Sequence, residues 1–211
     1  MVKTLKIPEA TIIRLSVYSR YMAQIKRKGI VTISSGEIAR GVGVSSAQVR
    51  KDLAYFGEFG TRGVGYNVGE LYGYLMKILG LTTQWKLVIV GAGKLGSALA
   101  MYGGFAERGF KVVGIFDNDP RKIGQKLDNL EIMDISQLPK IVEANEAKIG
   151  IIAVPAEEAQ EVTNILIKNG LKAILNFSPR VLSVPDDVVL RNVDLSVNLE
   201  ILSFYLDAQK R

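Results

Sequence analysis

The sequence predicts an α/β protein in which a small, basic, mostly helical segment precedes a doubly wound parallel sheet. Two observations predict this organisation. A G-x-G-x-x-G motif from Gly91 to Gly96 follows an apolar run, and a second apolar run ends on Asp117. Residues 1–80 carry 12 lysines and arginines against 5 aspartates and glutamates, whereas residues 81–211 carry 15 against 16. The basic excess therefore precedes the sheet, which is typical of a segment that binds a polyanion.

Composition limits the classes of function. The chain has 211 residues, of which 48% are hydrophobic, enough for one large or two small domains. It contains neither cysteine nor histidine, which excludes disulfides and the commonest metal ligands and acid–base catalyst, so we expect no bound metal. No apolar run reaches the roughly 20 residues that cross a bilayer, and residues 1–6 lack the apolar core of a signal peptide. We therefore expect no membrane contact and a cytoplasmic location.

The N-terminal segment begins with a long helix. Apolar residues at three- and four-residue steps predict about five turns between Pro8 and Gly29. A short extended run follows at residues 30–33. A second, short helix is then expected to end at Gly41 or Gly43.

Two capping boxes mark the second and third helices. Ser34 and Glu37 have the spacing of such a box, and Ser45 and Gln48 repeat it. The third helix is expected to run to about Phe56. The segment therefore reads as helix, turn, helix.

The third helix is a candidate recognition helix. On a helical wheel Val49, Leu53 and Phe56 share one face, and the opposite face is small and basic. An ordinary amphipathic helix has the same periodicity, so the helix alone leaves both interpretations open. The candidate DNA contacts on and beside it are Ser45, Ser46, Gln48, Arg50, Lys51 and Tyr55.

A glycine-rich hairpin is expected next. Residues 57–66 contain four glycines, with Arg62 between the turns. A recognition helix followed by a hairpin with a basic tip is the winged-helix arrangement, in which the wing arginine enters the minor groove. Together with the charge asymmetry, this predicts binding to double-stranded DNA. An apolar helix at residues 71–80 closes the domain, and residues 81–84 connect it to the sheet.

The glycine motif predicts a Rossmann-type site for NAD or NADH. Gly91 permits the tight turn, Gly93 permits close approach to a pyrophosphate, and Gly96 permits close packing of helix on strand. Asp117, 21 residues after Gly96, favours an unmodified ribose and hence NAD(H), although the nearby Arg121 and Lys122 are able to hold an extra phosphate. A glycine-rich turn without a ligand is the alternative. The candidate cofactor residues of this motif are Gly91, Ala92, Gly93, Lys94, Leu95, Gly96 and Asp117.

After Asp117 the alternation of strands and helices continues. The expected elements are a short one at 132–133, helices at 136–144 and 156–169, and strands at 148–154, 172–177 and 188–190. Ligands of such sheets lie outside the carboxyl ends of the strands. The candidates for the nicotinamide side are therefore Val154, Pro155, Asn176, Phe177 and Ser178, each of which has the alternative role of shaping a loop.

The final helix, expected at residues 194–209, is apolar around most of its circumference. Its leucines recur at alternating four- and three-residue steps, and further apolar residues occupy the rest of the wheel. Because its own domain covers a helix from one side only, the pattern predicts insertion into a partner subunit. Deep burial within its own chain is the alternative.

These motifs together resemble the family of redox-sensing transcriptional repressors called Rex, over essentially the whole chain. The matching segments are 49–53, 56–57, 60–66, 91–99 and 192–194. The resemblance implies a homodimer with a winged-helix DNA-binding domain at 1–80, a Rossmann NAD(H)-binding domain at 81–191 and a C-terminal domain-swapped helix at 192–211. It also implies repression of genes for respiration or fermentative NADH reoxidation, with release of a palindromic operator when NADH is high.

The resemblance also implies roles for individual residues. Arg50 and Lys51 match positions of the family's recognition helix, and Arg62 matches its wing. A network that links the DNA-binding domain, the Rossmann domain and the swapped helix is matched by Arg20, Tyr102 and Asp194. The next residue is Leu195, where some members have an aromatic residue that covers the nicotinamide.

Three classes of function compete at this point: an NADH-responsive repressor, an NAD-dependent dehydrogenase, and a CoA- or nucleotide-binding regulatory subunit. Hydride transfer usually needs a positioned acid or base, yet the chain lacks histidine and a Tyr-x-x-x-Lys pair, and only about 20 residues follow the Rossmann segment. We therefore expect no enzyme and no catalytic residue. Asp117 opposes the 3'-phosphate of CoA, and the basic N-terminal segment also argues for the repressor.

Overall fold

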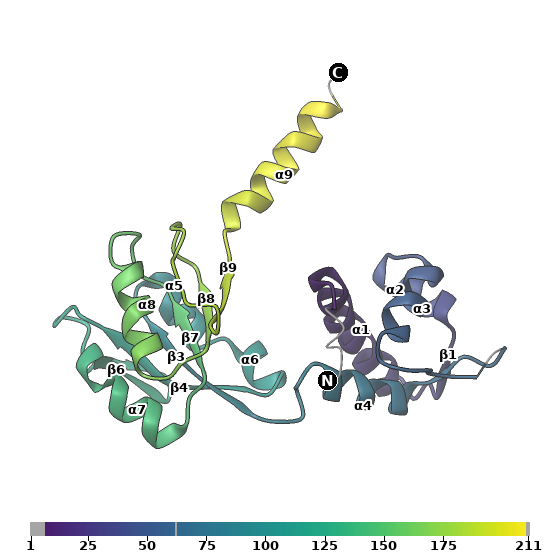
Figure 1. The fold of residues 1–211 in the computed structure, drawn as a ribbon, viewed down its shortest axis with the longest axis horizontal. Coiled ribbons are helices and arrows are strands. Elements are labelled where there is room, and N and C mark those ends of the chain that lie inside the picture. The colour runs from purple at the N-terminus through teal and green to yellow at the C-terminus, as the bar shows by residue number, and fades with distance from the viewer. Residues whose placement is uncertain (1–6, 62, 210–211) are drawn as a thin grey trace. The chain divides into compact units, whose positions relative to one another are not determined.

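The structure is a computed structural model that describes residues 7–61 and 63–209 (Figure 1). It divides into two compact units, Met1–Thr83 and Gln84–Arg211.

The described residues of the first unit form four helices and a small two-stranded sheet. Its elements are α1 (Glu9–Arg27), β1 (Thr32–Ile33), α2 (Ser35–Val42), α3 (Ser46–Ala54), β2 (Tyr66–Asn67) and α4 (Val68–Ile78). Leu15, Met22 and Tyr18 of α1 pack with Leu53 of α3 and Leu75 of α4 in one apolar core. The predicted order of helix, turn, helix is confirmed.

The two predicted capping boxes differ in the structure. At α2 both halves form, because Ser34 Oγ accepts from the backbone N–H of Glu37 at 3.2 Å and Glu37 Oε2 accepts from the Ser34 N–H at 2.8 Å. At α3 only one half forms: Ser45 Oγ accepts from the Gln48 N–H at 3.1 Å. The Gln48 side chain instead donates to Asp52, so the prediction of a second complete box was wrong.

The expected hairpin at residues 57–66 is shorter than predicted. Thr61 and Gly65 form one isolated antiparallel bridge, and the strand that follows, β2, pairs with β1. The backbone hydrogen bonds of Tyr66 and Asn67 are therefore used across the domain, leaving only a small wing. Arg62, the expected wing contact, lies outside the described residues.

The second unit contains a seven-stranded sheet in the order β5-β6-β4-β3-β7-β8-β9, parallel except for β5 against β6. Its strands are β3 (Trp85–Val90), β4 (Phe110–Asp117), β5 (Lys126–Leu127), β6 (Leu130–Asp134), β7 (Ile149–Ile152), β8 (Ala173–Asn176) and β9 (Val189–Asn192). The chain turns from β3 to β4 on one side and then to β7 on the other. The predicted doubly wound sheet is confirmed, and its switch point lies beside β3.

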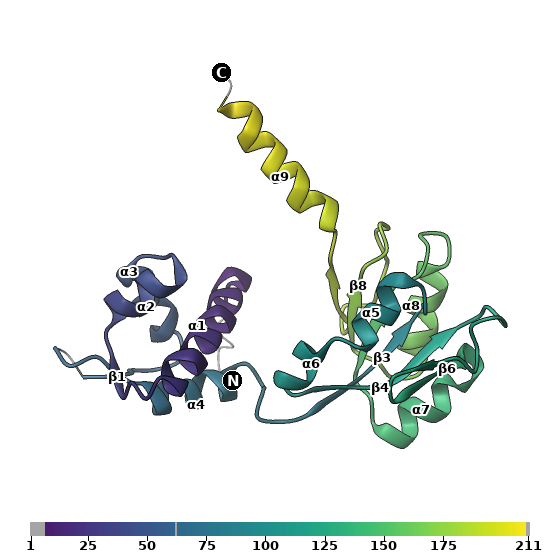
Figure 2. The same ribbon diagram turned by 180° about the vertical axis from the view of Figure 1, so that it is seen from behind.

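Helices cover both faces of this sheet (Figure 2). They are α5 (Lys94–Ala100), α6 (Gly103–Glu107), the 3₁₀ turn η1 (Ile135–Gln137), α7 (Leu138–Asn145) and α8 (Ala159–Lys168). One apolar core includes Val88 and Val90 of β3 with α7 and α8, and the other includes Leu87 and Ile89 with α5 and α6. Alternate residues of β3 thus point to opposite faces, as a central strand requires.

Some boundaries differ from the predicted ones. The helix expected from residue 156 starts at Ala159, because a turn follows Pro155. The helix expected from residue 136 begins as η1 and continues as α7. The sequence analysis missed α6 and β5, since five residues with two glycines and a two-residue strand give no periodic signal.

The final helix, α9 (Leu195–Ala208), buries none of its residues in the chain. It begins at Asp194, whose Oδ1 accepts from the Ser196 N–H at 2.8 Å. Leu199 and Phe204 are 67% and 68% exposed. The alternative of deep burial in its own chain is therefore wrong (Figure 1).

Candidate functional site

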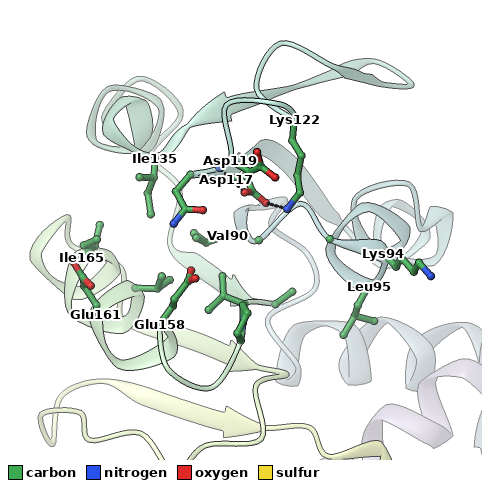
Figure 3. A pocket seen from close by; sticks show the side chains of 17 residues that line it. Val90, Lys94, Leu95, Asp117, Asp119, Lys122, Ile135, Glu158, Glu161 and Ile165 are labelled. Atoms are coloured by element: carbon green, nitrogen blue, oxygen red, sulfur yellow. Dashed lines mark hydrogen bonds and ion pairs between the residues drawn. The ribbon is translucent and has the colours of Figure 1, made fainter.

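A cavity of about 610 Å³ lies at the carboxyl ends of β3, β4 and β7, beside the switch point of the sheet (Figure 3). This volume is in the range of small-molecule sites. The lining residues are Val90, Gly91, Gly93, Lys94, Leu95, Asp117, Asn118, Asp119, Lys122, Ile135, Ala153, Val154, Pro155, Glu158, Glu161, Val162 and Ile165. They include seven of the twelve candidate cofactor residues.

The glycine turn has the close contacts that only glycine permits. Gly91 has φ +101°, and a Cβ on it would lie 2.4 Å from the Ala153 carbonyl oxygen. A Cβ on Gly96 would lie 1.8 Å from the Gly91 carbonyl oxygen, so α5 packs directly on the turn. A Cβ on Gly93 would meet nothing within 4 Å. The space beside Gly93 is thus open to a ligand.

Asp117 joins the end of β4 to the glycine turn. Its carboxylate is 6% exposed; Oδ2 accepts from the Ala92 N–H at 2.8 Å and from Lys122 Nζ at 2.9 Å, and Oδ1 accepts from the Asp119 N–H at 2.9 Å. Burial alone would raise the pKa of Asp117, but these hydrogen bonds, led by that of Lys122, lower it. Because a carboxylate has about four acceptor positions, one position on Oδ1 remains for a ligand hydroxyl.

The side chains of Arg121 and Lys122, the two cations near Asp117, point in different directions. Arg121 forms an ion pair with Asp119 at 2.9 Å, and its side chain is 90% exposed. Lys122 lines the cavity and points at Asp117 (Figure 3). Of the two, only Lys122 is therefore placed to meet a phosphate on the ribose.

The opposite wall combines apolar and acidic side chains. Ile135 and Ile165 provide apolar side chains, and Glu158 and Glu161 provide two carboxylates (Figure 3). Val162 also lines the cavity. The sequence analysis missed all five. The spacing of Val162 and Ile165 places them on one side of α8, but a buried core side of a helix gives the same signal.

The candidate nicotinamide contacts at the end of β8 and just after it do not line this cavity. They are Asn176, Phe177 and Ser178. Asn176 is buried, and its Nδ2 donates to the backbone oxygens of Ser178 at 3.1 Å and Arg180 at 3.2 Å. Its side chain thus shapes the loop after β8. Ser178 Oγ is buried and has no hydrogen-bond partner among the described residues.

The candidate DNA contacts other than Arg62 lie along α3, from its N-cap Ser45 to its C-cap Tyr55. Ser45, Arg50 and Lys51 are exposed, and Arg50 Nη1 donates to Ser35 Oγ at 3.0 Å. Ser46, Gln48 and Tyr55 are half-buried. On the wheel Lys51 lies opposite the core residues of α3 and Arg50 lies at the flank, and both are exposed in the structure.

The three residues of the implied network are all exposed. Tyr102 is 58% exposed and packs edge-on against Phe105, with ring centroids 5.2 Å apart. Arg20 is an exposed residue of α1. Asp194 is bonded to Ser196 at the start of α9. Each side chain thus has surface available for a partner.

Among residues 7–61 and 63–209, no helix is long and apolar enough to cross a membrane. The same residues contain no group of three or more acidic side chains arranged to hold a metal ion.

Comparisons with known proteins agree with the two units. The family model of the CoA binding domain matches residues 82–180, and the model of a putative DNA-binding protein N-terminus matches residues 6–54. The redox-sensing transcriptional repressor Rex of Syntrophomonas wolfei is 62% identical, with 99% of this chain and 100% of the relative covered.

Solved structures match over both units as well. The structure described as RSP in complex with β-NAD⁺ and operator DNA has a TM-score of 0.92 and 43% identity, covering 97% of this chain and 94% of that one. The structure of RSP in complex with β-NADH has a TM-score of 0.87 and 40% identity, covering 98% and 97%.

Proposed function

The chain belongs to the Rex family of redox-sensing transcriptional repressors, and we propose that it binds a palindromic operator when NADH is low and releases it when NADH binds. It regulates transcription and is not an enzyme. Relatives solved with NAD⁺ and operator DNA and with NADH support this function. A repressor works where the DNA is, and we place it in the cytoplasm.

The cavity at the switch point is the observation on which the proposal mainly rests. The pyrophosphate would lie over the open side of Gly93, and the adenosine ribose would donate to the remaining acceptor position of Asp117. The adenine would pack against Ile135 and Ile165. The same cavity then extends to Val154 and Pro155 for the nicotinamide end.

Ser178 is proposed as a polar contact at the nicotinamide end. A buried hydroxyl without a partner costs free energy unless a ligand satisfies it. Ser178 Oγ is such a group, and Asn176 holds its backbone through bonds to both the N–H and the carbonyl oxygen. Phe177 stands between them in the sequence. This loop therefore holds a buried hydroxyl that we assign to the carboxamide, although Ser178 is not one of the cavity-lining residues.

The DNA contacts are assigned to α3 and the wing. Arg50 and Lys51 would enter the major groove, and Arg62 would enter the minor groove. A palindromic operator has two-fold symmetry and requires a second copy of the chain. The uncovered α9 favours such a dimer. A row of leucines and aromatic residues more than 45% exposed is stable in water only when something covers it. We therefore propose a homodimer in which α9 packs on the partner subunit.

The network of Arg20, Tyr102 and Asp194 is proposed to transmit the signal. A ligand shifts a conformational equilibrium only through different affinities for the two states. NADH would favour the state in which the two recognition helices no longer match successive major grooves. Exchange of Asp194 between Arg20 and Tyr102 would accompany this change.

A mobility-shift titration tests the function. Duplex DNA selected from a random pool by the wild-type protein is incubated with it while NADH or NAD⁺ is added separately, with CoA as a third arm. NADH should release the DNA at concentrations at which NAD⁺ leaves it bound, and CoA should have no effect. Release by CoA alone, or equal release by NADH and NAD⁺, would contradict the proposal.

A further inference from the structure

A buried carboxylate fixes α3 against α1. Asp52 lies in the middle of α3 and is 0% exposed. Its oxygens accept from Thr11 Oγ1 at 3.2 Å, from Arg14 Nε at 2.6 Å and Nη2 at 2.7 Å, and from Tyr18 Oη at 2.8 Å. The three donors follow one another at steps of three and four along one side of α1. The orientation of α3 about its own axis is therefore set by directional bonds as well as by apolar packing.

The same carboxylate fixes the Gln48 side chain. Gln48 Nε2 donates to Asp52 Oδ1 at 2.9 Å. A carboxylate only accepts hydrogen bonds, so the amide nitrogen must face Asp52 and the amide oxygen must face away. Oδ1 holds this orientation rigidly, because it is itself fixed by Thr11 and Arg14.

Gln48 stands where a recognition helix meets base edges. It is the third residue of α3, after the N-cap Ser45, and its neighbours Ser46 and Ala47 are small. The N-terminal residues of recognition helices contact bases in the major groove. The half-buried side chain leaves its amide oxygen and its second N–H for a ligand.

An acceptor and a donor side by side match one base. Adenine presents an amino donor and the N7 acceptor in the major groove, whereas guanine presents two acceptors there. A glutamine held with its oxygen outward pairs with adenine and repels guanine O6. Without the bond to Asp52 the amide is free to turn and loses this preference.

We propose that Gln48 reads an adenine in each operator half-site and that Asp52 is the positioning residue that orients it. The inference rests on the proposed DNA-binding function and adds the base that one side chain selects. It also gives Asp52, a residue with no direct place on the DNA surface, an effect on sequence specificity.

The test measures base preference and not affinity alone. Wild-type protein selects a duplex from a random pool, and competition assays then compare single base-pair changes across the half-site. Wild type should prefer A·T over G·C at one position by about 5- to 150-fold, the range of a bidentate contact. Gln48→Ala should lose this preference at that position only. Gln24→Ala, the same change at an exposed position of α1, is the matched control and should keep the whole profile.

Two further variants test the orientation. Asp52→Asn is able to donate as well as accept, so it should reduce the roughly 5- to 150-fold preference of wild type toward about one. Gln48→Glu has only acceptors, so it loses the bond to Asp52 and should lose the preference for A·T. Any new preference at that base pair should be for C·G, because cytosine presents an amino donor. Thermal melting identifies variants that do not fold. If Asp52→Asn does not fold, Gln48→Glu still tests whether the bond between Gln48 and Asp52 sets the base preference.

The outcomes separate the inference from the function on which it rests. If wild type binds its selected duplex specifically but Gln48→Ala keeps the full profile, or weakens all sequences equally, the inference is wrong and the function stands. A folded Asp52→Asn protein with wild-type discrimination would remove the positioning role. If wild type selects no duplex, the proposed function and the inference both fail.

Discussion

Replacing Asp117 by asparagine should change which dinucleotide the cavity accepts. With the ribose placed as proposed, the wild-type carboxylate would repel a 2'-phosphate, and it holds Lys122 by an ion pair of 2.9 Å. Asparagine keeps the size of the side chain but removes the negative charge. Lys122, whose side chain is 36% exposed and lines the cavity, is then free to meet that phosphate.

The size of the effect follows from the two charges involved. At an effective dielectric constant of about 20, a unit charge pair about 4 Å apart interacts by about 4 kcal/mol. Solvent reduces this energy strongly for the partly exposed Lys122. The substitution should therefore change the difference in binding free energy between NADH and NADPH by about 1.5 to 3 kcal/mol. The ratio of their affinities should therefore move toward NADPH by about 10- to 150-fold.

Calorimetric titration of each protein with NADH and with NADPH at pH 7 measures this ratio. The pKa of Asp117 is lowered in the folded protein, so the carboxylate is ionised at this pH and its full effect is present. Asp119→Asn is the matched control, because Asp119 lines the same cavity but pairs with the exposed Arg121. A folded Asp117→Asn protein with the wild-type ratio, or an equal change in the control, would refute the reasoning.

Four more predictions test other parts of the molecule. Leu199→Asp should weaken dimerisation by at least about 2 kcal/mol per subunit, seen by sedimentation, because it charges an apolar surface; a wild-type dimer would contradict the role of α9. Asp194→Ala and Tyr102→Phe should keep operator binding but blunt its release by NADH, and normal release in both would exclude the network. Arg50→Ala should weaken DNA binding and flatten its salt dependence by about one unit per subunit if it contacts a phosphate. The pKa of Asp52 is lowered in the folded state because hydrogen bonds from its neighbours outweigh its burial. The stabilisation that ionised Asp52 provides is therefore complete above its unfolded pKa of 3.8 and should be lost as the pH falls below that value. The melting temperatures of wild type and Asp52→Asn should converge across this range.

The sequence was most informative where local spacing decides the structure. The glycines, the strand before them and Asp117 follow a fixed pattern, and the structure forms the expected turn with Gly96 against Gly91. The Ser34 box also depends on residues three apart. These features involve one element and its neighbour, so periodicity and spacing are enough to find them.

Features that depend on long-range contacts were not found. Asp52 bonds to residues about 40 positions away, and those bonds redirected Gln48 from the predicted capping box. One signal was present: Asp52 lies between Val49 and Leu53 on the core side of α3, and an acid there requires a buried partner. Nothing local indicates which of Arg121 and Lys122 faces the cavity. The wing was overestimated, since glycines mark a turn but not the length of its strands.

Because α9 is uncovered in its own chain, the folding of the repressor depends on how much of it the cell contains. A helix of 14 residues with none buried has no tertiary support from its own chain, and isolated helices of this length are marginal in water. With dimerisation as proposed, the helix is complete only when two chains meet, so the stability of the protein depends on its concentration. The fraction of active repressor then rises steeply as synthesis begins, and chains that are too dilute to pair expose an apolar helix to proteases. The cell's level of the protein is thus part of the switch, alongside the level of the dinucleotide.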